Sequence, residues 1–415
     1  MRKSNHNIQM RTFIILGILA VCFTNCQFTK GKTKPDAGSF EALANKCELE
    51  RHQLWEKKEY AQAVIAMKDV YASYQSLDAN LKPKYADGMS MLFYNLSCGY
   101  ALLQQKDSAL NYLQKAVHLG YSDYELLIRD SDLIRIRNEQ KYIEQVEQLK
   151  KTYDFEFILK QAKTYKAETQ KLPYFSFQLD YAEVLVNLRN KYKLDSIAGK
   201  GDEISQIINL MQWVHRTVRH DGNSLNPKDC CADALIEVCK KEKRGVNCRM
   251  LATILNEVYL AEGFQSQFVT CLPKSKTDSE CHVINSVFSK TLNKWLWMDP
   301  TFETWVKDDR GNLLSIPEVR ERLITGLQVF ASPGMNWNGK PSDPDNYLHH
   351  YMAKNLFQIR IPKKSSSGYE NWNYQDLTYV QLISLEYQSE YPELNGLKDQ
   401  VYYTTDSEQF WKHPE

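Results

Sequence analysis

The stretch RGVNCRMLA (residues 244–252) predicts the start of a helix with Cys248 in its first turn. Asn247 is a preferred N-cap residue, and apolar residues recur at helical spacing from residue 250 to residue 258. Gly263 follows, where the end of a helix favours a left-handed residue. Unpaired backbone N–H groups and the positive end of the helix dipole stabilise a thiolate, so we expect the pKa of Cys248 to lie below the ordinary value of about 8.5. Cys248 is therefore a candidate nucleophile.

Two further polar residues, His282 and Asp299, stand at the ends of predicted strands. Short runs rich in β-branched and aromatic residues, separated by polar turns, are typical of an antiparallel meander. These runs are residues 265–272, 282–289 and 294–299. His282 begins the second run and Asp299 closes the third, and in an antiparallel pair these positions lie at the same end of the sheet. We expect Asp299 to orient His282, and His282 to activate Cys248.

Each of these residues also has an ordinary structural interpretation. A cysteine at a helix start is most often a small buried residue, a histidine that begins a strand is most often partly exposed, and Asp-Pro commonly opens a turn. All three occur here in the expected order and on the expected elements. Their joint occurrence favours a catalytic triad of Cys248, His282 and Asp299.

The segments around these residues follow a known family pattern. A glycine shortly precedes the helix-opening cysteine, the helix ends in Ala-x-Gly-Phe at 261–264, and a Trp-x-x-x-Asp-Pro-Thr close stands at 295–301. Residues 204–218 and 233–236 look like the two helices that precede the cysteine helix. With these motifs, residues 200–310 resemble the transglutaminase-like superfamily, a branch of the papain-like thiol enzymes.

The resemblance implies an α+β fold, in which a transglutaminase-like core packs the cysteine helix on an antiparallel sheet. It also implies a Cys-His-Asp triad. One departure is the histidine strand, which commonly reads H-A-W-x-E in the family and reads HVINS from His282 here, so substrate preference stays open. The oxyanion hole is open as well: the backbone N–H of Cys248 is one candidate donor, and Trp213 is a candidate for assistance.

The N-terminus predicts export. Basic residues precede an apolar run at 13–23 that is too short to span a bilayer, which needs about 20 helical residues, and that is typical of a secretory signal. Cys26 follows in FTNC, which resembles a bacterial lipoprotein lipobox, although Asn25 departs from the usual small residue. Cys22 is the rival lipidation site, and an ordinary signal peptide is the alternative. We expect a lipid anchor on Cys26, with 29–38 as a tether to a periplasmic or outer-membrane surface.

The charge balance argues against a nucleic-acid partner. The chain of 415 residues carries 52 Lys and Arg against 51 Asp and Glu, so no net field attracts phosphate backbones. Its 10 cysteines suit an exported chain, and a bridge between Cys271 and Cys281 across one hairpin is reasonable. Cys230, Cys231 and Cys239 form a second group, without another ligand pair at zinc spacing. We therefore expect no metal and no cofactor.

Residues 40–165 read as helical hairpins. The placement of small and aromatic residues at 94–117 is similar to one tetratricopeptide repeat, but an earlier half-match at 59–63 lies too far upstream for the usual period of about 34 residues. A short repeat-like unit is predicted, which either binds a protein partner or serves only for packing. The predicted domains are a signal peptide at 1–25, a tether at 26–39, an all-α helical-hairpin domain at 40–165, a transglutaminase-like catalytic domain at 166–330 and a strand and loop extension at 331–415.

Two classes of function remain open. In the first, an exported thiol enzyme attacks an amide bond of a protein or peptide substrate, forms an acyl-enzyme on Cys248 and passes the acyl group to water in preference to an amine. In the second, a surface-anchored module binds a protein or peptide without catalysis. The complete set of Cys248, His282 and Asp299 favours the enzyme.

Overall fold

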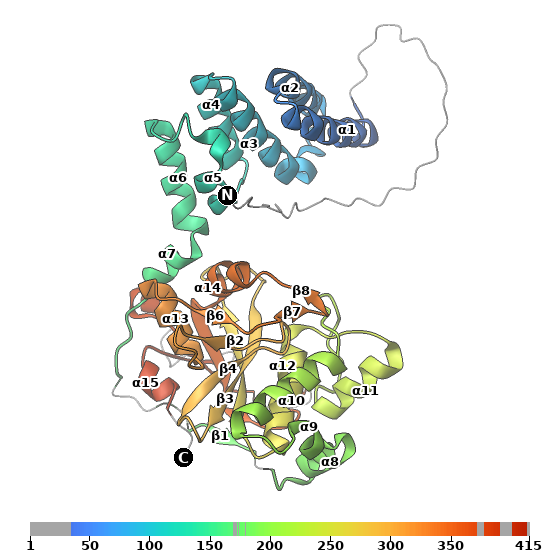
Figure 1. Ribbon diagram of the computed structural model, residues 1–415, viewed down its shortest axis with the longest axis vertical. Helices are drawn as coiled ribbons and strands as arrows, with labels where there is room; N and C mark the ends of the chain where they lie inside the picture. Colours follow the sequence, from blue (N-terminus) through green and yellow to red (C-terminus); the bar gives the residue numbers. More distant parts are fainter. Residues whose placement is uncertain are drawn as a thin grey trace, which may run out of the picture.

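The computed structural model describes residues 35–168, 172, 174–178, 180–371, 377–390 and 401–412. Figure 1 shows two bodies, a helical one above and a larger one built on a sheet below, with helix α7 (Phe155–Lys160) between them. The lipidation candidate Cys26 lies outside the described residues. Within the described part of the chain, no helix is both long and apolar enough to cross a bilayer.

The upper body consists of consecutive helices around one core. They are α1 (Ala37–Glu56), α2 (Tyr60–Ser76), α3 (Ala86–Leu102), α4 (Lys106–His118), α5 (Tyr124–Arg129) and α6 (Gln140–Tyr153), with short 3-10 turns at η1 (Lys82–Tyr85) and η2 (Ser131–Leu133). Leu96 and Ala109 are fully buried where α3 and α4 pack. Gly99 on α3 lies so close to α2 that a Cβ atom there would stand 2.7 Å from a methyl carbon of Val64. Small residues thus let these helices pack closely.

A six-stranded sheet forms the centre of the lower body, in the order β12-β11-β9-β2-β3-β4. Its strands are β2 (Ser266–Leu272), β3 (His282–Ser289), β4 (Lys294–Met298), β9 (Gln358–Pro362), β11 (Tyr379–Leu382) and β12 (Val401–Thr404). Strands β2, β3 and β4 form the antiparallel meander that the sequence predicted. Strand β9 pairs with the other edge of β2, so the C-terminal strands extend the sheet that carries His282.

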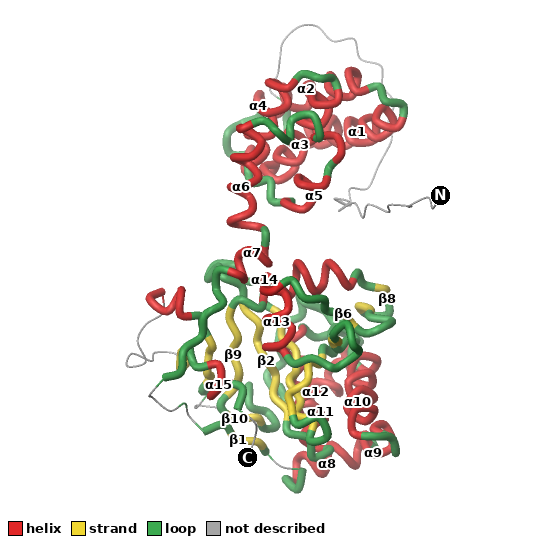
Figure 2. Tube along the Cα trace, turned by 60° about the vertical axis from the view of Figure 1, so that its left-hand side comes forward, coloured by secondary structure: helices red, strands yellow, loops and turns green. Residues whose placement is uncertain are grey.

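Helix α12 (Cys248–Ala261) packs against β2 and β3, and every residue from Met250 onward is buried. Around it lie α8 (Glu183–Tyr192), α9 (Leu194–Ala198), α10 (Glu203–Thr217) and α11 (Ala232–Glu242). Figure 2 shows α10, α11 and α12 on one side of the strands. The expected α+β fold, with the cysteine helix on an antiparallel sheet and helices before it, is confirmed.

A second apolar core joins the sheet to several short helices. Val269, Ile284 and Trp297 of the strands pack in it. The helices are α13 (Ile316–Thr325), the π-helix η3 (Asn346–Met352) and α14 (Ala353–Asn355). Helix α7 contacts all three, and Glu156 on α7 lies 2.5 Å from the Nδ1 atom of His349 on η3. The helical body is therefore tied to the segment that covers this part of the sheet.

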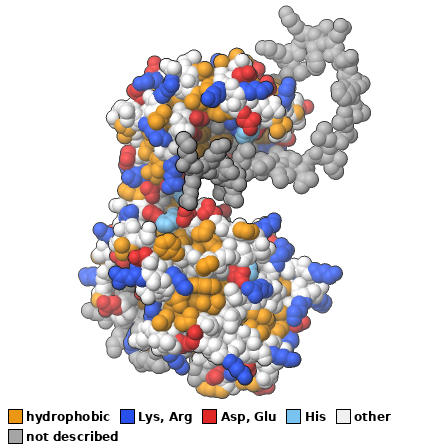
Figure 3. All heavy atoms as spheres, in the orientation of Figure 1, with side chains coloured by type: hydrophobic (Ala, Val, Ile, Leu, Met, Phe, Trp, Pro, Cys, Tyr) orange, Lys and Arg blue, Asp and Glu red, His pale blue; other side chains and the backbone are white. Residues whose placement is uncertain are grey.

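Small paired strands and short helices complete the lower body. They are β1 (Ser176–Phe177), β5 (Val306–Lys307), β6 (Phe330–Ala331), β7 (Asn336–Trp337), β8 (Lys340–Pro341), β10 (Lys364–Ser365), η4 (Leu385–Glu390) and α15 (Ser407–Phe410). On the face in Figure 3, acidic and basic side chains are mixed over both bodies. This mixing matches the near-zero net charge of the chain.

Candidate active site

His282 and Asp299 form a buried hydrogen-bonded pair. In the register of β3 with β4, Asn285 lies opposite Met298, which puts the next residue, Asp299, on the face of the sheet that His282 shares. The Nε2 atom of His282 donates to Oδ2 of Asp299 across 2.7 Å, and both side chains are almost fully buried. The two residues that the sequence placed at one end of the sheet are thus in contact.

Three further hydrogen bonds hold the carboxylate of Asp299. The Tyr347 hydroxyl donates to Oδ2 across 2.6 Å, and the backbone N–H groups of Thr301 and Phe302 donate to Oδ1 across 2.8 and 3.3 Å. Burial raises the pKa of the carboxyl, but the charge and hydrogen bond of His282, with the Tyr347 and Thr301 donors, lower it below its ordinary value. Asp299 is therefore a carboxylate with a fixed orientation.

Aromatic rings flank the imidazole of His282. The ring centroids of Phe302 and Tyr351 lie 5.7 and 5.2 Å from its own. Burial lowers the pKa of this imidazole, but interactions with Tyr351, Asp299 and Cys248 raise it well above the ordinary value. Since Nε2 is bound to Asp299, and Nδ1 is buried without a hydrogen-bond partner among the described residues, Nδ1 is the ring atom left for Cys248.

Cys248 opens α12, as the sequence predicted. The side chain of Asn247 caps the helix by accepting the N–H of Met250 across 3.1 Å. The Cys248 thiol is half-buried, and burial acts to raise its pKa. Hydrogen bonds with His220 and His282, together with the charge of His282 and a backbone N–H of β3, outweigh burial and lower the pKa of Cys248 to about 5. Cys248 is thus a thiolate at neutral pH.

The second histidine at the thiol, His220, is a residue that sequence reasoning missed. It follows α10, and its backbone forms a parallel bridge with Val246, next to the loop that leads into α12. This close approach requires Gly245, because a Cβ atom there would stand 2.5 Å from the carbonyl oxygen of Arg219. No short motif marks His220; the glycine, which signals a close backbone neighbour, is the only hint in the sequence.

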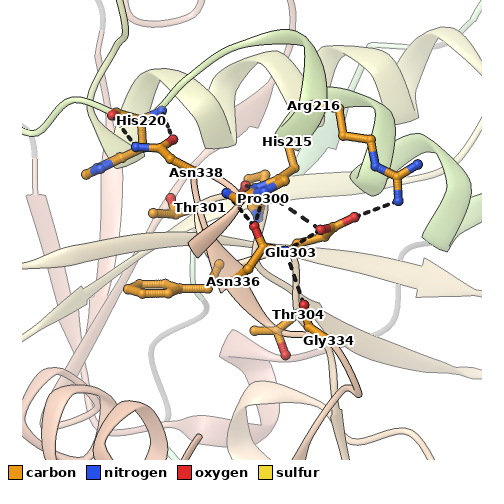
Figure 4. A network of polar contacts seen from close by, with 12 residues as sticks. His215, Arg216, His220, Pro300, Thr301, Glu303, Thr304, Gly334, Asn336 and Asn338 are labelled. Carbon is orange, nitrogen blue, oxygen red and sulfur yellow. Dashed lines mark hydrogen bonds and ion pairs between the residues drawn. The ribbon is translucent and has the colours of Figure 1, made fainter. Parts of the chain in front are cut away.

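A polar network connects His220 with the loop that follows Asp299 (Figure 4). The Asn338 side chain bonds both backbone groups of His220. His215 of α10 contacts the carbonyl oxygen of Pro300 through Nδ1 and Oδ1 of Asn336 through Nε2, each across 2.9 Å. Helix α10, the loop after β4 and the β7–β8 hairpin are therefore joined beside the thiol.

Trp213, the candidate for assistance at the oxyanion hole, packs among the helices. Its ring lies 5.6 Å from that of Tyr192, between centroids, and belongs to the core of α10 and α12. Because the ring of Trp213 packs against Tyr192 of α8, its position does not support a role at the oxyanion hole. Tyr347, which holds Asp299, was also missed, since it comes from a π-helix far along the chain.

The remaining cysteines of the described residues are free thiols. Cys271 and Cys281 are not bridged, so the structure does not contain the disulfide that the sequence made reasonable across this hairpin. Cys230, Cys231 and Cys239 are also free. Among the residues that the structure describes, one group of possible metal ligands comes together, Cys98 with Asp130 and Asp132, and it lies in the helical body away from Cys248.

Comparison with known proteins agrees with the motifs around Cys248. Residues 191–300 match the family described as the Transglutaminase-like superfamily. The solved structure of a "Putative Cysteine Protease" from Cytophaga hutchinsonii is similar at 16% identity, covering 35% of this chain and 48% of that chain, with a TM-score of 0.24. The match therefore spans about half the length of that protein. No curated protein matches. The chain thus contains a transglutaminase-like domain at residues 191–300, and Cys248, His282 and Asp299 all lie within it.

Proposed function

We propose that this protein is an exported thiol enzyme that cleaves amide bonds of a protein or peptide substrate through an acyl-enzyme on Cys248. One observation carries the proposal. The buried pair of His282 and Asp299, with 2.7 Å between Nε2 and Oδ2, lies beside a thiol whose pKa is lowered to about 5. A thiolate, an imidazole and an orienting carboxylate are the groups that acyl transfer needs.

The first half-reaction forms the acyl-enzyme. The Cys248 thiolate attacks the carbonyl carbon, the C–S bond forms, and one electron pair of the carbonyl moves to its oxygen. The backbone N–H of Cys248, at the start of α12, is a donor for this oxyanion. The protonated His282 then gives its proton to the leaving nitrogen as the C–N bond breaks.

The second half-reaction releases the acyl group. His282, now neutral, accepts a proton from water, whose oxygen attacks the thioester carbon, and the C–S bond breaks to restore the Cys248 thiolate. Asp299 keeps the imidazole oriented throughout. The residue Cys248 is partly exposed, and water is far more concentrated than any amine. We therefore favour hydrolysis over transfer to an amine.

A thiol-directed acylating probe tests this function on the wild type and on Cys248→Ala. Cys231→Ala is the matched control, because Cys231 is also half-buried but burial raises its pKa to about 12. We expect Cys248→Ala alone to lose probe labelling and substrate turnover. Labelling of Cys248 without release of an acyl group from any amide or peptide substrate would assign a binding module in place of the enzyme.

We further propose that the mature chain begins at a lipid-bearing Cys26. The apolar run at 13–23 ends just before this cysteine, and the polar segment 29–38 can serve as a tether. Several acyl chains together anchor a protein stably where one is marginal. Detergent partitioning and N-terminal peptide analysis should show Cys26→Ser leaving the membrane fraction while Cys22→Ser remains there. Full partitioning of Cys26→Ser with membranes would exclude this anchor.

A further inference from the structure

Backbone contacts on two sides fix the position of His220. On one side its bridge with Val246 holds it beside the segment that leads into Cys248. On the other side Asn338 accepts the His220 N–H through Oδ1 across 2.8 Å and donates to the His220 carbonyl through Nδ2 across 2.9 Å. Figure 4 shows Asn338 reaching this backbone from the β7–β8 hairpin. The imidazole is thus positioned by contacts that need no substrate.

Trp337 determines which nitrogen of His220 carries the proton. The indole Nε1 donates to Nδ1 of His220 across 2.9 Å, and the two rings meet edge-on with centroids 6.0 Å apart. An indole N–H can only donate, so Nδ1 acts as the acceptor and the hydrogen of the neutral ring is on Nε2. In this arrangement Nε2 is the N–H donor that the ring can offer to Cys248, whose pKa His220 lowers.

We propose that His220 is a second catalytic residue, which donates Nε2–H first to the Cys248 thiolate and then to the oxyanion that nucleophilic attack produces. This inference rests on the proposed acyl-enzyme function and deepens it by assigning a side-chain donor to the oxyanion hole. His282 cannot take this role and remain the proton carrier, because its Nε2 atom is bound to Asp299 and its Nδ1 atom serves the leaving group.

The two histidines therefore perform different steps. During attack, negative charge passes from the sulfur of Cys248 to the carbonyl oxygen, and no proton leaves His220. The Nε2–H group of His220 stabilises the negative charge first on the sulfur and then on the carbonyl oxygen. The backbone N–H of Cys248 is the second donor to that oxygen. Removing one donor from an oxyanion hole typically costs about 10²- to 10³-fold in rate.

Three variants of the full chain distinguish a role of His220 as a hydrogen-bond donor from a purely structural role. His220→Ala removes the donor, and His220→Gln returns an N–H group at the same position. Trp337→Phe keeps an aromatic ring but removes the N–H that fixes the tautomer. His52→Ala, which deletes an imidazole in the helical body, is the control. Each is measured by its acylation rate with an amide-derived probe and by the pH midpoint of Cys248 alkylation, with thermal unfolding to verify the fold.

His220→Ala should slow acylation about 10²-fold and shift the alkylation midpoint to higher pH. His220→Gln should recover part of both, Trp337→Phe should shift both less in the same direction, and His52→Ala should change neither. An unchanged acylation rate and an unchanged pH midpoint of Cys248 alkylation in His220→Ala would overturn the proposal. If His220→Ala does not fold, the same two unchanged values in Trp337→Phe would overturn it. A wild type that no amide probe acylates refutes the proposed function separately, and the alkylation midpoint then decides whether His220 stabilises the thiolate.

Discussion

The pKa of Cys248 in the sheet body and the pKa values of the buried thiols in the helical body are shifted in opposite directions. In the helical body, burial raises the pKa of Cys47 to about 11 and that of Cys98 well above its ordinary value, and the carboxylate of Asp130, 3.5 Å from the Cys98 sulfur, adds to the effect. In the sheet body, burial acts in the same direction on Cys248, but two imidazoles reverse the outcome. The neighbours of a buried thiol, and not burial itself, decide whether it is a nucleophile.

The largest expected effect comes from removing the base. His282→Ala should lower turnover about 10⁴-fold, the upper end of what a general acid–base group contributes, because no other group at the site carries the proton. Steady-state kinetics on an accepted amide substrate measures this, with His52→Ala as the control for loss of an imidazole in the helical body. Full activity in His282→Ala would refute the triad.

The difference in pKa between Cys248 and the other buried thiols is tested by measuring alkylation rates against pH. With its pKa lowered to about 5, Cys248 is a thiolate above that pH, so its alkylation rate should stay high at pH 7 and fall as the pH drops through about 5. Burial raises the pKa of the half-buried Cys231 to about 12, so that residue should react only in alkaline solution. At pH 7 we expect Cys248 to react roughly 10³-fold faster or more, as its larger thiolate fraction requires. Mass spectrometry that found equal labelling of Cys248 and Cys98 would contradict the comparison.

A smaller effect is expected from Asp299→Asn. The amide can still accept from the imidazole of His282 but loses the negative charge that stabilises the imidazolium, so we expect a loss of about 10²-fold, the low end for acid–base groups. Tyr347→Phe, which removes one hydrogen bond to the same carboxylate, is the matched milder variant. Both should lower kcat more than they change KM. An Asp299→Asn variant as inactive as His282→Ala would show that the carboxylate does more than orient and stabilise the ring.

Local sequence signals predicted the parts of the site that local structure positions. Asn247 before an apolar helical pattern specifies where α12 begins, and that beginning places Cys248 in the first turn. Runs rich in β-branched and aromatic residues specify β2, β3 and β4, whose register brings His282 and Asp299 together. The resemblance to the transglutaminase-like superfamily implied the fold class, and the local signals agree with it, because the apolar faces of a helix and a meander are buried by packing on each other.

Other parts of the site depend on contacts between distant segments, which no local pattern encodes. His220 is held near Cys248 by a backbone bridge with Val246 and by hydrogen bonds with the side chain of Asn338. Asn338 lies more than a hundred positions after His220 in the sequence. Tyr347 reaches Asp299 from a π-helix. Trp213 was a candidate for assistance at the oxyanion hole, but its ring packs against that of Tyr192 on α8, a contact that no local pattern encodes.

The smallest effect tests whether the helical body is independent of the thiol chemistry. In Gly99→Ala the added carbon would stand 2.7 Å from a methyl carbon of Val64, so overpacking of about 1–3 kcal/mol should exceed the gain of about 1 kcal/mol in helix propensity and lower the free energy of unfolding. Gly88→Ala on the same helix is the matched control, because nothing lies within 4 Å of its added carbon, and it should become more stable. Urea unfolding followed by circular dichroism measures both changes.

The pH midpoint of Cys248 alkylation should stay the same in the two variants, since both positions lie on α3 and the groups that lower the pKa of Cys248 all belong to the sheet body. A midpoint that moved with Gly99→Ala would instead show that packing in the helical body affects the site, and the contact of Glu156 on α7 with His349 on η3 is one route between the two bodies.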